Sequence, residues 1–145
     1  MERKWVITGL ILIILAIILG AFGAHGLKTL LQYHEVFGAF DAAEKRRDIL
    51  ASFDTATKYQ FFQGLGFLVI PFMNTRFQVQ SKTIFLLMVL GTIFFSGSIY
   101  GLTVSKIHGL ESLKRILGPV TPIGGVLMIL AWFFLLIRVI RYRLP

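Results

Sequence analysis

The 145 residues of this chain are 56% hydrophobic and have a mean hydropathy of +0.78, which is more apolar than soluble domains of this size. The net charge of +8 comes from Lys and Arg residues that lie between and beyond the apolar runs. No basic face interleaved with aromatic residues indicates nucleic-acid binding, so we exclude a nucleic-acid partner. The absence of cysteine excludes disulfides, thiolate chemistry, iron–sulfur clusters and S-acylation.

Four apolar runs approach or exceed the roughly 18–20 residues that cross a hydrocarbon layer about 30 Å thick as a helix. They predict an all-α integral membrane protein, a single domain over 1–145. The predicted fold is a four-transmembrane-helix bundle with short interfacial helices in the first and third connections. The predicted spans are 5–24, 55–74, 83–104 and 121–139.

The first apolar run follows Arg3 and Lys4 and could also be a secretory signal peptide, because Ala21 and Gly23 supply small residues near its end. The run is longer than the roughly 7–15 apolar residues usual for a signal peptide. We therefore expect it to be a span.

The connection 26–54 is polar and amphipathic and holds five of the seven acidic residues. Asp41 and Glu44 have the spacing of a capping box, which predicts a helix from near Ala42 that lies at the interface and runs into the second span. Asp54 and Lys58 are four residues apart, so we expect them to form an ion pair on the outer turn of that helix. Such a pair is ordinary for an exposed helix surface.

A short loop after the second span predicts that the third span is its antiparallel neighbour. The following residues 109–117 predict a short amphipathic helix that Gly118 would end. Thr121 would then cap the fourth span, with Pro122 at the first helical position, where proline loses no hydrogen bond.

Four spans place both termini on one side of the membrane. The two tails and the second loop carry seven Lys and Arg residues, and the other two loops carry eight. The tails and the second loop hold their charges close to span ends, which favours cytoplasmic termini in a bacterial inner membrane.

No carboxylate falls within a predicted span, which argues against an ion-coupled carrier. The polar residues in or next to the spans must find partners, so we expect them to meet across helix interfaces. They either hold the helices together or line a small cavity for a lipid headgroup, a quinone or another ligand, with His25 the titratable member. The set is His25, Tyr59, Gln60, Gln63, Ser96, Ser98, Tyr100 and Thr121.

Glycines recur at spacings that let helix backbones approach each other closely. We predict helix packing, within the chain or between copies, at Gly20, Gly23, Gly97, Gly101, Gly124 and Gly125. His34 and Glu35 lack a second histidine at the helical zinc spacing, and no phosphate loop or nucleophile elbow occurs. We expect no enzyme, no metal site and no cofactor.

Four motifs occur in order over nearly the whole chain: AFGAHGLK (21–28), TATKYQ (55–60), FFSGSIYGL (94–102) and TPIGG (121–125). In order and spacing they resemble the YgdD/YwdK-like family of small inner-membrane proteins. The resemblance implies a four-span bundle of unknown function with relatives in eukaryotic membranes. Gln63 stands where the family often has His three residues after the YQ pair, which weakens a paired-histidine metal or proton site with His25. Ala131 stands where the family often has Gly before the Trp of the last span. The connection before the second span is also longer here than in typical relatives.

Two classes of function follow from these patterns. The first is a structural or accessory protein that packs against lipids, itself or a larger membrane complex through glycine-rich helix faces. The second is a small permease or ligand-binding protein built on the uncharged polar cluster around His25.

Overall fold

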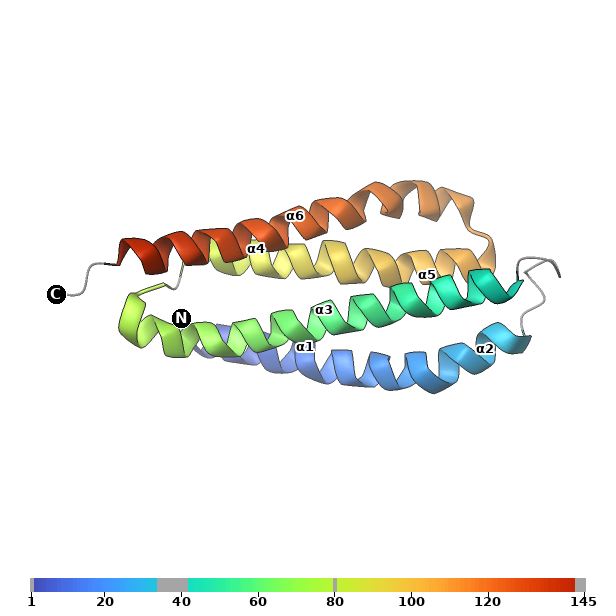
Figure 1. The fold of residues 1–145 in the computed structure, drawn as a ribbon, viewed down its shortest axis with the longest axis horizontal. Coiled ribbons are helices and arrows are strands. Elements are labelled where there is room, and N and C mark those ends of the chain that lie inside the picture. The colour runs from blue at the N-terminus through green and yellow to red at the C-terminus, as the bar shows by residue number, and fades with distance from the viewer. Residues whose placement is uncertain (1, 34–41, 80, 143–145) are drawn as a thin grey trace.

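The computed structural model describes residues 2–33, 42–79 and 81–142, and the elements assigned within these ranges are all helical. They form four long helical columns that lie side by side, each antiparallel to the one before it in the chain (Figure 1). The first column is α1 (Glu2–Phe22), the π-helical turn η1 (Gly23–Leu27) and α2 (Lys28–Tyr33); the second is α3 (Ala42–Phe77); the third is α4 (Lys82–Thr92), the π-helical turn η2 (Ile93–Gly97) and α5 (Ser98–His108); the fourth is α6 (Glu111–Arg141).

The columns associate as two hairpins. The first column packs along α3, and α6 packs along the third column, while the hairpins meet where α3 contacts the third column. Two apolar clusters hold this arrangement, one toward each end. The first is built around Trp5, Phe67, Met88 and Ala131, and the second around Leu27, Leu31, Ile49, Phe53 and Ile107.

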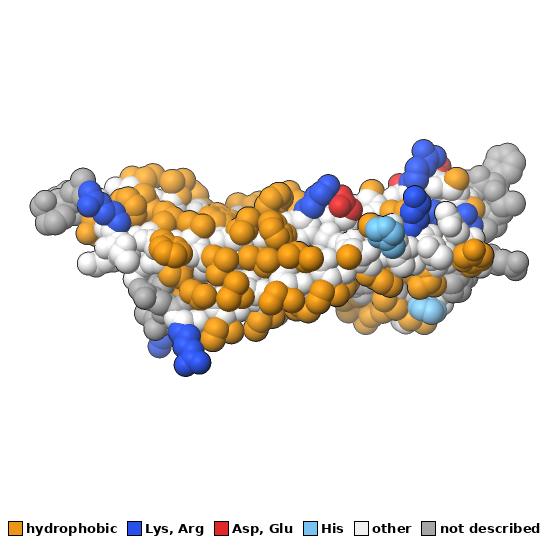
Figure 2. Space-filling model, turned by 90° about the horizontal axis from the view of Figure 1, so that it is seen from below, with side chains coloured by type: hydrophobic (Ala, Val, Ile, Leu, Met, Phe, Trp, Pro, Cys, Tyr) orange, Lys and Arg blue, Asp and Glu red, His pale blue; other side chains and the backbone are white. Residues whose placement is uncertain are grey.

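Most of the outer surface is apolar, as Figure 2 shows for one face. Ile14 and Ile17 on α1 are 55% and 59% exposed, and Ile129 on α6 is 69% exposed. Exposure of so much apolar surface is unfavourable in water and favourable in the hydrocarbon of a bilayer. The all-α membrane class predicted from the sequence is therefore confirmed.

By length and composition, three helices among the described residues could cross a membrane: Arg3–Tyr33, Lys82–His108 and Glu111–Arg141. The predicted second span, 55–74, lies in α3 and does not reach the same hydropathy. The helix is long enough at 36 residues, but Lys58, Gln60 and Gln63 interrupt its apolar sequence. Four crossings are thus not established by composition alone.

The helix expected to begin near Ala42 and to run into the second span is confirmed by α3. Residues 42–54 are the first turns of α3 itself, because no glycine or proline interrupts the chain before Gly64 and because Ile49 and Phe53 are buried against Leu27. The helix is described from Ala42, close to its predicted start. The predicted cap Asp41 lies outside the described residues.

The separate short helix expected in the third connection is wrong. The chain turns at Gly109, whose φ is +67°, and α6 then runs without a break through Gly118, Pro119 and Pro122. Thr121 is therefore an interior residue and no cap. The prolines each remove one backbone hydrogen bond, but packing against the third column keeps this stretch helical, as is common in membrane helices.

Candidate functional site

A buried hydrogen-bonded network joins three columns near the middle of the molecule. The amide nitrogen of Gln60 donates to the carbonyl oxygen of Leu12 on α1 at 3.0 Å. The hydroxyl of Tyr100 on α5 donates to the amide oxygen of Gln60 at 2.9 Å. Both ends of the Gln60 side chain are thus engaged in contacts between helices, in keeping with its 5% exposure.

Further predicted polar residues make the other links between columns. Ser96 in η2 donates to the carbonyl oxygen of Ala56 at 2.8 Å. The hydroxyls of Ser98 and Thr121 lie 2.7 Å apart and tie α5 to α6. The indole of Trp132 on α6 donates to the amide oxygen of Gln63 at 3.1 Å. Trp132 is a partner that the sequence patterns did not single out.

The structure does not bring His25 to this network. His25 lies in η1 with its side chain exposed, in a shallow surface hollow beside Gly26 and Thr29, whereas Gln60 and Tyr100 lie in the interior. The predicted cavity shared by His25 and the other polar residues is therefore wrong. The first column stays helical through this stretch, so His25 is turned outward by its position on the helix.

Tyr59 also lies outside the network. Its ring is 48% exposed and packs against Phe95 with a centroid distance of 5.1 Å. It borders a groove of about 730 Å³ between α3 and α6, two columns that make little direct contact. The groove is mostly apolar, and its lining includes Phe62, Gln63, Trp132 and Phe133.

The predicted packing glycines fall into two groups. A Cβ at Gly23 or Gly101 would collide with the side chain of Phe53 or Leu117, and one at Gly124 would overlap the backbone of Phe95. Close packing is confirmed at these three glycines. Within the chain, Gly20 faces open space, and Gly97 and Gly125 have only ordinary contacts, so these three glycines do not bring the columns close together.

The closest approach of α1 and α3 uses two glycines that the sequence patterns did not single out. A Cβ at Gly9 would lie 2.8 Å from the carbonyl oxygen of Gly64, and one at Gly64 would lie 2.7 Å from the side chain of Ile13. Single glycines on separate helices carry no spacing motif, so only the register of the two helices reveals that they face each other.

Asp54 and Lys58 form the charged pair expected from their spacing, with 2.6 Å between Lys58 Nζ and Asp54 Oδ2. The expected place of this pair, on an outer turn, is wrong. The two residues bracket Ala56, which accepts the bond from Ser96 halfway along the third column. They therefore lie at mid-height of the columns, and a carboxylate is present at a height where none was predicted.

The register of α3 against α1 gives the same height. Gln60 meets Leu12, so Lys58 lies level with the middle of the apolar run of α1. At 1.5 Å per residue, Arg3 at one end and Lys28 at the other are each about 15–20 Å away along the helix axis. Lys58 is thus far from both charged ends, whereas Asp54 lies one turn nearer to the end that carries Lys28, with which it lines a small hollow.

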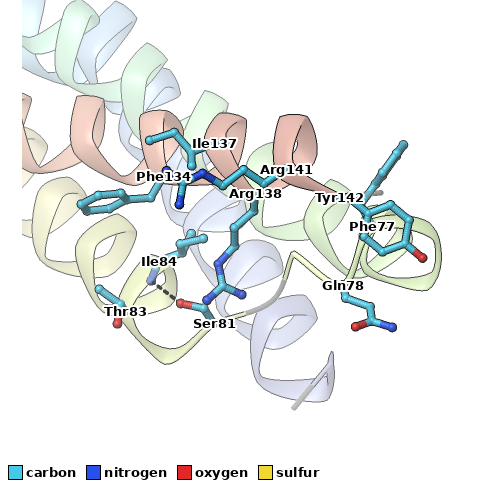
Figure 3. Close-up of a pocket in the computed structure, with 10 residues that line it drawn as sticks. All are labelled: Phe77, Gln78, Ser81, Thr83, Ile84, Phe134, Ile137, Arg138, Arg141 and Tyr142. Carbon is cyan, nitrogen blue, oxygen red and sulfur yellow. Dashed lines mark hydrogen bonds between the residues drawn. The ribbon is translucent and has the colours of Figure 1, made fainter. Parts of the chain in front are cut away.

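The other basic residues gather at the two ends of the molecule, and Figure 2 shows basic side chains at both ends of one face. The end with the N-terminus also contains a hollow of about 490 Å³ between α4 and α6 (Figure 3). Arg138 and Arg141 line it, and Ser81 caps α4 there by accepting a bond from the Ile84 backbone at 3.2 Å. This arrangement suits the headgroup region of a bilayer. Arg143, the third arginine at the basic end of the fourth apolar run, lies outside the described residues.

Long antiparallel helices, apolar outer faces and interior polar groups used for bonds between helices together define a helical integral membrane protein. The protein-family model described as "Protein of unknown function (DUF423)" matches residues 19–125. The chain belongs to this family, whose curated members include UPF0382 membrane proteins such as YwdK, as the sequence resemblance implied.

The relatives match nearly end to end. A UPF0382 membrane protein of Staphylococcus epidermidis is 35% identical over 140 residues, covering 97% of this chain and 98% of the relative. YwdK of Bacillus subtilis is 32% identical over 144 residues, with the same coverage, and a Schizosaccharomyces pombe relative is 35% identical over 132 residues, covering 90% and 93%. No solved structure matches significantly.

Proposed function

We propose that α3 crosses the membrane together with the other three columns, so that the protein spans the bilayer four times. The helix runs antiparallel to two apolar columns and matches their length, with Arg47 near one end and Arg76 near the other. The low hydropathy of α3 comes partly from Gln60 and Gln63, whose side chains bond to neighbouring helices and not to water. Satisfied amides of this kind can lie inside a membrane.

For the location we propose a multi-pass protein of the bacterial inner membrane with cytoplasmic termini. Bacterial relatives named as membrane proteins support the compartment. The orientation rests on the dense basic charge next to span ends at the side of the termini, where Arg3, Lys4, Arg76 and Lys82 lie.

For the activity we propose a non-catalytic accessory protein that works by assembling with other membrane components. The observation that carries this proposal is the Asp54–Lys58 pair at mid-height on an exposed face of α3. Ionisable residues at this depth are costly in lipid and mark functional contacts. The interior supports the same conclusion, because Gln60 and Tyr100 satisfy each other and offer no ligand cavity.

A small permease or ligand-binding protein is the second candidate, and the groove beside Tyr59 and Trp132 is the observation that favours it. The groove opens sideways, is mostly apolar and lacks His25, so it suits an acyl chain better than a polar solute. We therefore place this candidate behind assembly, with membrane lipids as the occupant of the groove.

Extraction of the tagged protein into lipid nanodiscs from its own membrane tests the assembly proposal. We expect a particle whose mass corresponds to an oligomer or to a complex with a co-purifying membrane protein. A monodisperse monomer without a partner, obtained also after cross-linking in the intact membrane, would contradict it. Cross-linking before extraction guards against loss of a weak partner in detergent.

A further inference from the structure

The Asp54–Lys58 pair faces outward from the molecule near the middle of the columns. Its two side chains are 57% and 63% exposed, and the columns on either side of α3 leave this face open. If α3 spans the bilayer as proposed above, both charges meet hydrocarbon in a lone copy. A pair in that position gains stability from a partner that covers it and offers further charged groups.

The pair belongs to a longer exposed stripe on α3. Exposed residues recur every three or four positions over about six turns, which is the spacing of a helix face that packs against another long helix. Phe62 is 60% exposed, Val69 51% and Phe72 77%. The stripe consists of Ala51, Asp54, Lys58, Phe62, Leu65, Val69 and Phe72.

We propose that this α3 stripe is the contact surface for a second copy of the chain, an inference that rests on the assembly proposed above. The stripe carries one acidic and one basic residue a single turn apart. In a two-fold dimer, Lys58 of each copy can therefore reach Asp54 of the other, so that the surface complements itself. The apolar residues from Phe62 to Phe72 continue the contact toward one end of the bilayer.

A second copy is favoured over a different protein because its own stripe carries one basic and one acidic residue, which are the charges that complement Asp54 and Lys58. A partner that offers one charge would compete for one member of the Asp54–Lys58 pair and leave the other without a matching group. A polar pair within an otherwise apolar seam also sets the register of two packed helices, which is the best attested use of such groups.

Single cysteines test the surface directly, since the wild-type chain contains none. Ala51→Cys and Leu65→Cys place thiols on the stripe, and Ile14→Cys places one on the exposed face of α1 as a control at similar height. Oxidation in intact membranes should link copies through positions 51 and 65 and leave the position 14 variant unlinked. Equal or absent linking at all three positions would overturn the proposal.

Charge reversal tests the exchanged pair. Asp54→Lys and Lys58→Asp, each expressed alone, place like charges across the contact and should lower self-association by about tenfold or more. Co-expression of the two variants with different tags should restore association, because each then offers the charge that the other needs. No recovery on co-expression, with both proteins inserted at normal levels, would overturn the exchange.

The results also separate this inference from the broader proposal. Cross-linking of the stripe cysteines to a protein of another mass would overturn the second-copy assignment while supporting assembly. A chain that remains monomeric and without a partner under every condition would overturn both. The cysteine variants keep the test valid if a charge-reversed variant fails to insert.

Discussion

The side chain of Gln60 accepts a hydrogen bond from Tyr100 at 2.9 Å across the junction of the two hairpins. Its amide nitrogen holds α1 at the same time through Leu12. One residue of α3 therefore couples three columns, and α3 is the central element of the bundle. The polar residues of this helix lower its hydropathy, yet they also fix its neighbours.

Removal of this junction should destabilise the bundle. We expect Tyr100→Phe to cost about 0.6–1.7 kcal/mol of unfolding free energy, the range for one bond between membrane helices. Gln60→Leu should cost more, about 1–3 kcal/mol, because it leaves the Tyr100 hydroxyl without its partner. Unfolding measured in lipid or mild detergent, including the double variant, gives the coupling between the two residues.

Tyr59→Phe is the matched control, since the Tyr59 ring is half exposed and borders the groove. It should leave stability nearly unchanged. A loss equal to that of Tyr100→Phe would show that the bond to Gln60 is not what stabilises the junction.

A second prediction concerns the contact between α6 and the third column. Gly124→Ala should destabilise the protein by about 1–3 kcal/mol, because the new methyl group meets the backbone of Phe95, which cannot rotate away as a side chain could. Gly20→Ala is the control, since its Cβ would face open space, and it should be neutral or slightly stabilising. Thermal unfolding of both variants compares them, and equal losses would contradict the assignment.

These glycines show how far sequence patterns reach. The apolar runs and their charged ends were enough to predict the helices, because run length and turn residues are local properties. Spacing alone predicted contact equally for Gly20 and Gly124, but only the register between columns decides which one faces a neighbour. The same limit applies to His25, which lies 13 residues beyond Leu12 along the first column, about 20 Å from the level of Gln60, with its side chain exposed.

The height of the Asp54–Lys58 pair could not be read from the sequence for a related reason. The polar residues before it looked like a connection that ends near Thr55. In the structure α3 begins at Ala42, so these polar turns lie at the end of the bundle, Asp54 lies about a third of the way along α3 and Lys58 near its middle. The height of a residue in a bundle depends on where its neighbours begin and end, which local sequence does not specify.

The third prediction tests the crossing by α3. Glu44→Cys and Arg76→Cys place thiols near its two ends, and a membrane-impermeant maleimide should reach them from opposite sides of the membrane. With cytoplasmic termini, position 44 reacts in intact cells and position 76 only after permeabilisation. Lys28→Cys and Lys82→Cys, at the ends of adjacent columns, should follow positions 44 and 76, respectively. Labelling of 44 and 76 from one side would exclude the crossing.

The fourth prediction compares the two tryptophans in their surroundings. Trp132 is 42% exposed and lines the groove between α3 and α6, whereas Trp5 is 1% exposed within an apolar cluster. Trp132 should therefore touch lipid acyl chains and Trp5 should not. Fluorescence of Trp5→Phe and Trp132→Phe, each retaining a single tryptophan, in bilayers with brominated acyl chains measures this contact.

Bromine quenches by contact, so the Trp5→Phe variant, which retains Trp132, should lose much of its emission, and the Trp132→Phe variant should lose little. Bilayers of the same lipids without bromine correct for changes in folding or intensity. Strong quenching of Trp5 would mean that the cluster around Phe67 and Phe85 is open to lipid, against its ring contacts of 5.6 and 5.1 Å. Protection of Trp132 would mean that another protein segment fills the groove, since a bound acyl chain would itself carry the bromine.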